Sequence, residues 1–250
     1  MEYFYIPELG AAGRQLSVVG QEARHIIKVL RHNPGDELWA TDGRGNEFRL
    51  VIKSIKSDRL MVRVLEKRPG QREPGRKVSL ALAVLKGDKL RTVVEAVTEL
   101  GVSEILPFVS ERVIGRMDEA RLHRIRAVAV SGMKTALGTV LPVIRPVVSL
   151  SRLISSFSDY QQVIVAYEEE QERGIADVLN LGIRSLLLVI GPEGGFTTDE
   201  VAQLQDGGAV AVTLGPRRLR AEIAAIVATG VCFSLTGDLG GKLNSAKGGG

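Results

Sequence analysis

Three short stretches carry residue types suited to holding a ligand against the backbone. They read "IVAYEEE" (164–170), "VIGPEGGFTTDE" (189–200) and "VTLGPRRLRAE" (212–222). Two of them place a Gly-Pro turn directly after an apolar run, and glycine permits close approach and positive φ. A ligand in such turns is contacted mainly by backbone groups. The alternative is that they are simply tight connections between strands and helices.

These turns match neither of two common nucleotide sites. The sequence has no G-x-x-x-x-G-K-[ST] phosphate loop and no G-x-G-x-x-G dinucleotide fingerprint. Two glycine-rich turns that close on each other can instead hold a flat, adenine-bearing ligand through backbone groups. We therefore expect the site where these stretches meet.

The elements that must position these turns alternate between strand and helix. Buried strands are predicted at "KVSLALAVL", "SEILPFVS", "QQVIVAY", "SLLLVI" and "GAVAVTLG". Alternation of this kind predicts a mostly parallel α/β sheet. Ligands of such sheets bind at the carboxyl ends of the strands.

Helical spacing and capping residues predict the helices between these strands. "DKLRTVVEAVTELG" repeats its apolar residues on one face, with Asp88 as cap and Gly101 as stop. Thr197 and Glu200 form a capping box that opens a helix to about Gln205. Further helices are expected at about 118–137 and in "LRAEIAAIVATGVCFSL".

The N-terminal part of the chain has a different pattern. "EKRPGQREPGRK" (66–77) contains two Pro-Gly pairs and predicts a linker. Before it, alternating runs around "DGRGN" predict a hairpin, and "EARHIIKVL" predicts one short helix. We expect a small β-barrel or β-rich module with Trp39 and Phe48 in its core.

The excess positive charge lies in this first part. Residues 1–76 hold 14 Lys and Arg against 10 Asp and Glu, whereas residues 77–250 hold 19 of each. This distribution favours a nucleic-acid-facing module. A plain solvated surface is the alternative.

Composition limits the remaining classes. The only cysteine, Cys232, excludes an internal disulfide and a cysteine-based zinc site, and we expect a buried structural thiol. His32 and His123 lack acidic or cysteine partners at metal spacing, so we expect surface residues and no metal. No apolar run reaches the ~20 residues of a membrane span. With a single cysteine, a reducing, cytoplasmic setting is the default expectation.

The chain resembles the RsmE family of the SPOUT methyltransferases along nearly its whole length. The resemblance rests on "HIIKVLRHNPGDEL" with "DGRGNEF", on "LKGDKLRTVVEAVTELGVSEILPFVSERV", and on the two loops "IGPEGGFTTDEV" and "LGPRRLRAEIA", in that order. It implies methylation of N3 of a uridine in small-subunit (16S) ribosomal RNA, free or within the assembled subunit. S-adenosylmethionine is the implied cosubstrate.

The resemblance also implies an architecture. A PUA-like β-barrel RNA-binding domain is expected at 1–72, and a SPOUT α/β domain with a trefoil knot at 73–240. Separately, the Gly-rich sequence at 241–250 predicts a disordered tail. The family works as a homodimer. The cosubstrate is expected to contact Ala166, Tyr167, Ile190, Gly191, Pro192, Glu193, Gly194, Gly195, Leu214, Gly215, Leu219 and Ala224.

Other residues are assigned to the reaction and to RNA. Arg220 is the candidate to stabilise negative charge on the uracil, or else it pairs with Glu222 or Glu193. Glu222 orients Arg220 or takes the proton, unless it is a helix-surface carboxylate. Glu193 holds its loop or contacts the cosubstrate. RNA contacts are expected from Arg24, His25, Lys28 and Arg31, unless they form a plain basic helix face. Lys86 either contacts RNA or braces the domain junction. Arg121, Arg124 and Arg126 are expected on a solvated helix face.

Some positions depart from the family pattern. Thr135, Ala136, Ala221 and Ile223 replace polar residues that are usual there. A second function on the same fold therefore stays open, that of an RNA- or ribosome-binding protein with weakened or no catalysis.

Overall fold

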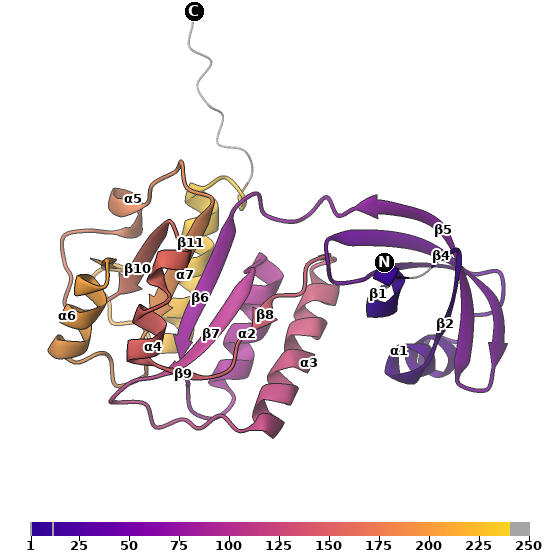
Figure 1. Ribbon diagram of the computed structural model, residues 1–250, viewed down its shortest axis with the longest axis horizontal. Coiled ribbons are helices and arrows are strands. Elements are labelled where there is room, and N and C mark those ends of the chain that lie inside the picture. Colours follow the sequence, from indigo (N-terminus) through magenta and orange to yellow (C-terminus); the bar gives the residue numbers. More distant parts are fainter. Residues whose placement is uncertain (1, 12, 241–250) are drawn as a thin grey trace, which may run out of the picture. The chain divides into compact units, whose positions relative to one another are not determined.

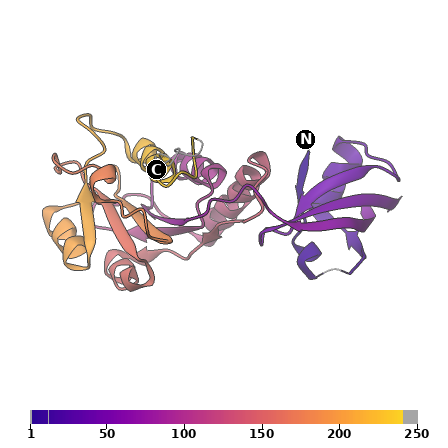
Figure 2. The same ribbon diagram turned by 90° about the horizontal axis from the view of Figure 1, so that it is seen from above.

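The computed structural model describes residues 2–11 and 13–240, so the tail predicted at 241–250 lies outside the described residues. The chain divides into two compact units, Met1–Glu73 with Val130–Leu141, and Pro74–Ala129 with Pro142–Gly250. Helix α3 (Glu119–Thr135) contributes residues to both units. Figures 1 and 2 show the elements in two views.

The first unit contains a five-stranded sheet with the order β1-β3-β4-β5-β2. Its strands are β1 (Tyr3–Tyr5), β2 (Gln15–Val18), β3 (Glu37–Thr41), β4 (Asn46–Lys56) and β5 (Arg59–Pro69). The predicted hairpin is confirmed, because β3 and β4 pair antiparallel across the "DGRGN" turn. In that turn the Asp42 carboxylate accepts the Arg44 amide at 2.8 Å.

The helical segments of this unit are short. They are the 3-10 helix η1 (Pro7–Ala11), the helix α1 (Gly20–Arg24) and the π-helical turn η2 (His25–Val29). The single helix predicted here is thus an α turn that continues as a π turn. It ends near Arg31, which takes a left-handed backbone conformation with φ 58°.

The core of the first unit lies between the sheet and these segments. Phe48 is buried there with residues such as Phe4 and Ile26, as predicted. Trp39 corrects the prediction, because it is only half-buried and stands outside this core. The Arg68 guanidinium lies 4.6 Å from its ring centroid. Its neighbours Leu38 and Ala40 are buried, so Trp39 lies on the other face of β3.

The segment predicted as a linker is shorter than expected and is held in place. Residues 66–69 belong to β5. The Glu73 carboxylate accepts the Thr139 hydroxyl at 2.9 Å. The Arg76 guanidinium donates to the carbonyls of Leu181 and Thr236, both at 2.7 Å.

The second unit contains a seven-stranded sheet with the order β12-β10-β11-β6-β7-β8, in which β9 also pairs with β7. The strands are β6 (Lys77–Ala83), β7 (Glu104–Val109), β8 (Val143–Ile144), β9 (Val148–Ser149), β10 (Gln162–Ala166), β11 (Ser185–Ile190) and β12 (Ala209–Val212). All of these pairs are parallel, which confirms the predicted α/β sheet. The trefoil knot stays a prediction.

Helices cover this sheet. They are α2 (Lys89–Leu100), α4 (Leu150–Ile154), α5 (Ile175–Val178), α6 (Thr198–Asp206) and α7 (Ala221–Leu235), with a 3-10 turn η3 (Phe157–Asp159). α2 ends at Gly101 with φ 95°, as predicted, but the side chain of Asp88 makes no cap hydrogen bond. Both bonds of the capping box at Thr197 and Glu200 are present.

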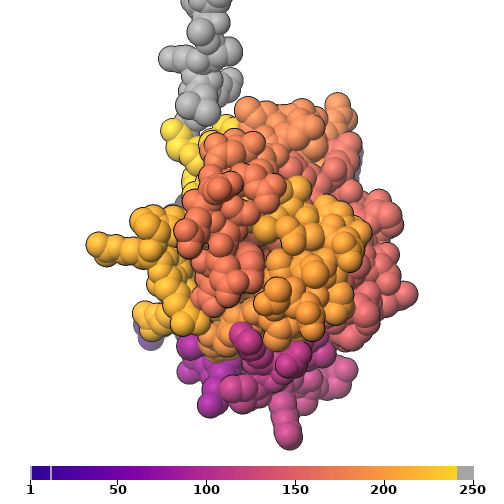
Figure 3. All heavy atoms as spheres, turned by 90° about the vertical axis from the view of Figure 1, so that its left-hand side faces the viewer, coloured from indigo at the N-terminus to yellow at the C-terminus, as the bar shows by residue number. Residues whose placement is uncertain are grey.

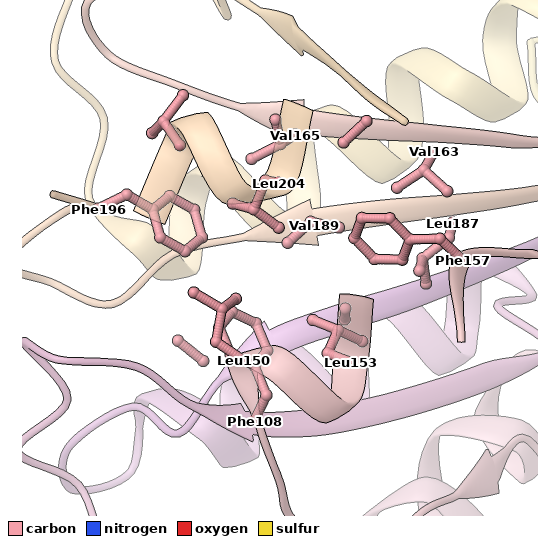
Figure 4. Packing of buried hydrophobic residues seen from close by; sticks show 14 of the residues in the cluster. Phe108, Leu150, Leu153, Phe157, Val163, Val165, Leu187, Val189, Phe196 and Leu204 are labelled. Carbon is pink, nitrogen blue, oxygen red and sulfur yellow. The ribbon is translucent and has the colours of Figure 1, made fainter. Parts of the chain in front are cut away.

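One hydrophobic cluster fixes the loop after β11 to the sheet. Leu150 and Leu153 of α4 and Leu204 of α6 pack with strand residues, as Figure 4 shows. Phe196 of the glycine-rich loop belongs to the same cluster and stacks on Phe108, with ring centroids 6.2 Å apart. The loop is therefore anchored in the core rather than free.

Candidate functional site

The C-terminal ends of β10, β11 and β12 lie side by side. Ala166 is opposite Ile190 of β11 in one direction and opposite Val212 of β12 in the other. The chain thus places the successive strands β11 and β12 on opposite sides of β10. Ligands of parallel sheets bind at such a reversal of strand order, outside the carboxyl ends of the strands. The three stretches singled out from the sequence are loops at this one edge.

A cavity of about 390 Å³ opens between these loops. Small-molecule sites commonly have ~300–1,000 Å³. Every predicted cosubstrate contact except Gly194 lines it. The predicted residues that do so are Ala166, Tyr167, Ile190, Gly191, Pro192, Glu193, Gly195, Leu214, Gly215, Leu219 and Ala224. Figure 3 shows the face of the second unit on which the orange segments, around residues 160 to 215, gather.

Sequence reasoning missed several lining residues. They are Glu168, Glu169, Phe196, Thr213, Pro216, Arg217, Arg218 and Ala221. All of them lie within the three stretches first quoted, so the sequence indicated the loops to which they belong but not the individual side chains. Which loop side chains turn inward depends on the loop conformation, and no pattern in the sequence encodes it.

Glycines in the first loop are required by space and by backbone conformation. A Cβ on Gly191 would stand 2.8 Å from the Phe196 ring. Gly195 has φ 69°, and a Cβ there would also stand 3.0 Å from the Glu168 carboxylate. Side chains at these positions would fill the cavity wall or displace the anchoring ring.

The loop after β7 holds the first loop and the start of α6 in place. The Arg112 guanidinium donates to the carbonyls of Gly194 at 3.0 Å and Phe196 at 3.4 Å. The Glu200 carboxylate accepts the Glu111 amide at 2.8 Å. Gly194 is thus turned toward Arg112, which explains why it does not line the cavity.

Glu193 ties the loop to the start of α2. Its Oε1 accepts the Lys86 amide at 3.0 Å and lies 3.2 Å from the Lys89 Nζ. Burial raises the pKa of Glu193, but these hydrogen bonds and the Lys89 charge outweigh it and leave the pKa below its usual value. Glu193 therefore stays ionised, holds its loop and lines the cavity.

The opposite wall is the loop after β12. Gly215 takes φ 109°, a conformation that favours glycine. The Arg218 Nε lies 2.9 Å from the Glu168 Oε2, so an ion pair joins this loop to the loop after β10. On that third loop the Tyr167 hydroxyl donates to Glu169 at 2.7 Å, and this hydrogen bond raises the pKa of Tyr167.

Arg220 and Glu222 lie beside the cavity rather than in its lining. The Arg220 Nε is 3.6 Å from the Glu222 Oε1. Glu222 is buried, so it is not the helix-surface carboxylate that the sequence left open. Its other oxygen lies 3.8 Å from the Lys89 Nζ. Sequence reasoning passed over Lys89, which follows Lys86 closely in the chain.

The residues predicted to contact RNA fall into two groups. Arg24, His25, Lys28 and Arg31 are all exposed on α1, η2 and the residues after them in the first unit. Lys86 is exposed in the second unit, before α2. The positive charges of the first group follow one another on one short segment.

Two other basic residues correct the predictions. His32 is not free of acidic partners, since its ring nitrogens lie 3.1 Å from Asp36 and from Glu2. Arg121 does not lie on a solvated face, since its guanidinium donates to the carbonyls of Leu85 at 2.7 Å and Gly87 at 2.8 Å. Arg121 therefore holds the loop that carries Lys86.

Cys232 is fully buried, as expected, and burial raises the pKa of its thiol to about 12. In the described ranges, no three His, Cys, Asp or Glu residues are grouped so that they could hold a metal ion. Among the same residues, no helix has both the length and the apolar character to cross a membrane.

The chain matches two family models, described as an RNA methyltransferase domain over residues 71–232 and an RNA methyltransferase PUA domain over residues 20–65. It is 32% identical over 222 residues to the ribosomal RNA small subunit methyltransferase E of Bacillus subtilis, covering 85% of this chain and 87% of that protein. The protein of that name from Mycobacterium bovis is 35% identical over 243 residues, covering 93% and 91%.

One solved structure with the same fold carries the same name. The crystal structure of a ribosomal RNA small subunit methyltransferase E from Neisseria gonorrhoeae, bound to S-adenosyl methionine, is 26% identical in sequence. It superimposes with a TM-score of 0.87, covering 96% of this chain and 100% of that chain.

Proposed function

The chain belongs to the ribosomal RNA small subunit methyltransferase E family, and on that premise we propose that it methylates N3 of a uridine in small-subunit (16S) ribosomal RNA with S-adenosylmethionine. The observation that carries the proposal is the cavity at the ends of β10, β11 and β12. Eleven of the twelve residues expected to contact the cosubstrate line it.

The residues around this cavity fit S-adenosylmethionine, which supplies a methyl group made electrophilic by a sulfonium. Ile190, Leu214 and Leu219 offer apolar surface that suits an adenine ring. Glu168 and Glu169 bring carboxylates to the lining, which suits a ligand that carries a sulfonium and an ammonium. The glycines of the first loop leave its backbone groups accessible.

The chemistry requires that N3 lose its proton, because methyl transfer uses the lone pair of that nitrogen. The chain can help by holding the reactants in line and by stabilising negative charge on the uracil oxygens. Arg220 is suited to the second task, since it is permanently charged and its side chain is 76% exposed beside the cavity. Glu222, buried next to it, is suited to orient Arg220 or to accept the proton.

RNA contact is assigned to the PUA-like domain at 1–72 and to Lys86 of the methyltransferase domain at 73–240. The exposed basic residues Arg24, His25, Lys28 and Arg31 support phosphate binding by the first of these. Ribosomal RNA as substrate also favours the cytoplasm as the place of action. The free RNA and the assembled subunit are both candidate substrates.

A homodimer completes the proposal. Ile223, Val227 and Val231 lie four residues apart on α7, and their exposed fractions are 38%, 41% and 36%. Residues at this spacing share one helix face, and an exposed apolar stripe is a typical contact surface. Since Arg220 precedes α7 and Glu222 lies in its first turn, a second copy would lie beside the reaction site.

Calorimetric titration with S-adenosylmethionine, compared with S-adenosylhomocysteine, tests the proposal first. We expect binding at micromolar strength, followed by the appearance of N3-methyluridine in small-subunit ribosomal RNA incubated with the protein. Absence of cosubstrate binding by the folded protein, with RNA affinity retained, would instead favour an RNA- or ribosome-binding protein without catalysis.

A further inference from the structure

We propose that Lys89 is a further catalytic residue and that the small cavity in front of it seats the target base. The inference rests on the function proposed above. This second cavity has about 170 Å³ and is lined by Lys89, Glu193, Arg218, Leu219, Arg220 and Ala221. One water takes ~30 Å³ in the liquid, so the space suits several waters or a single pyrimidine ring.

The position of this cavity suits a methyl acceptor. Four of its six lining residues, Glu193, Arg218, Leu219 and Ala221, also line the larger cavity. The two spaces therefore adjoin. A base in the smaller cavity would lie next to a methyl donor in the larger cavity, between the residues that line both.

Two cations that line this cavity share the buried carboxylate of Glu222, which does not itself line the cavity. Arg220 approaches the Glu222 Oε1 at 3.6 Å, and Lys89 approaches the Oε2 at 3.8 Å. Both distances are those of ion pairs without a hydrogen bond. Within the described residues, the Oε2 atom is buried and has no hydrogen-bond partner. A buried carboxylate in this condition retains lone pairs that can accept a proton.

This arrangement matches the charge changes of the reaction. Uracil presents its N3–H between two carbonyl oxygens. When the N3 proton passes to the Glu222 carboxylate, whose Oε1 faces Arg220, the negative charge moves from the carboxylate to the base, beside Lys89 and Arg220. The N3 lone pair then forms the N–CH₃ bond. The S–CH₃ bond breaks, and its electron pair stays on the sulfur as a neutral thioether.

Lys89 has more than a bracing role in this geometry. The Glu193 Oε1 that it contacts at 3.2 Å already accepts the Lys86 amide at 3.0 Å. The Lys89 side chain keeps 36% of its surface exposed, at the lining of the cavity. Its ammonium is thus held near two carboxylates and stays accessible to a third acceptor.

The test compares Lys89→Met with Lys89→Arg, which keeps the charge, and with Lys77→Met as the matched control. Lys77 is exposed at the start of β6, at the opposite end of that strand from the cavities. S-adenosylmethionine affinity is measured by calorimetry. Single-turnover methylation is measured on small ribosomal subunits assembled from RNA transcribed with uridine or with 5-fluorouridine, whose N3–H is more acidic.

We expect Lys89→Met to bind S-adenosylmethionine like the wild type and to methylate uridine about 10²-fold more slowly, the typical effect of removing one charge-stabilising donor. The deficit should shrink with 5-fluorouridine, which needs less charge stabilisation. Lys89→Arg should recover part of the rate, and Lys77→Met should match the wild type.

Two results would overturn the role of Lys89. One is an unchanged rate in Lys89→Met. The other is a loss of equal size on both bases, or a loss explained by weaker cosubstrate binding, since either indicates a structural brace. Failure of the wild-type protein itself to methylate ribosomal RNA would instead count against the proposed function.

Discussion

Arg220 and Glu222 lie two residues apart, yet their side chains are 76% and 10% exposed. Arg220 precedes α7 with extended backbone angles, whereas Glu222 lies in the first turn of the helix, where its side chain is buried. The pair thus joins an exposed cation to a buried carboxylate. That difference separates the two roles proposed for them.

Substitution of Arg220 tests its part in this pair. In Arg220→Ala we expect S-adenosylmethionine binding to survive, because Arg220 does not line the larger cavity. Methylation should fall by about 10²–10³-fold, as for loss of a transition-state donor. Arg184→Ala, which removes an exposed arginine before β11, is the control. Turnover equal to that of the control would remove Arg220 from the mechanism.

At the scale of elements, local signals in the sequence were sufficient for several helices. The apolar spacing after Asp88, the stop at Gly101 and the capping box at Thr197 predicted α2 and α6, because each signal acts within one or two turns. The π turn at His25–Val29 was not predicted, since its residues differ little from those of an ordinary helix.

The candidate site was predictable only in part, because short sequence signals report local structure and not the packing between elements. The Gly-Pro loops were recognisable from residue type, and the cavity they line was expected. The approach of Lys89 to Glu222 depends on the packing of α2 beside α7, which no short pattern reports. Likewise, the inward turn of Arg121 is decided by carbonyls of a distant loop.

The loop after β11 offers a test at this scale. In Gly191→Ala the new methyl group would meet the Phe196 ring at 2.8 Å, so either the ring or the loop must move. We expect S-adenosylmethionine to bind at least tenfold more weakly, which corresponds to about 1.4 kcal/mol. Calorimetry measures the change.

Gly13→Ala is the matched control for this loop. Gly13 lies in the first unit, and a methyl group added there would have no described neighbour within 4 Å, so it fits without displacement. Equal affinities for Gly191→Ala and Gly13→Ala would show that the wall formed by this loop does not contact the cosubstrate.

At the scale of the whole molecule, the apolar stripe on α7 predicts the assembly. Replacing Val227 by Glu places a charge in the middle of this stripe, where burial in an interface would be costly. We expect Val227→Glu to shift the protein from dimer to monomer in sedimentation velocity experiments. Methylation should fall with it if the second copy borders the site.

Leu181→Glu is the matched control, because Leu181 is 54% exposed and lies outside α7. It should remain dimeric. A dimer that survives Val227→Glu and dissociates in Leu181→Glu would assign the interface to a different surface.

The return of residues 130–141 to the first unit has a consequence for synthesis. The Thr139 carbonyl accepts the Gly45 amide at 2.8 Å and the Thr41 hydroxyl at 3.2 Å, so these groups find their partner only late in the sequence. When the first 73 residues have left the ribosome, Thr139 has not yet been synthesised. The N-terminal unit is therefore completed only after β6 and β7 of the second unit have been synthesised, and a gene fragment ending at the linker would encode an unfinished fold.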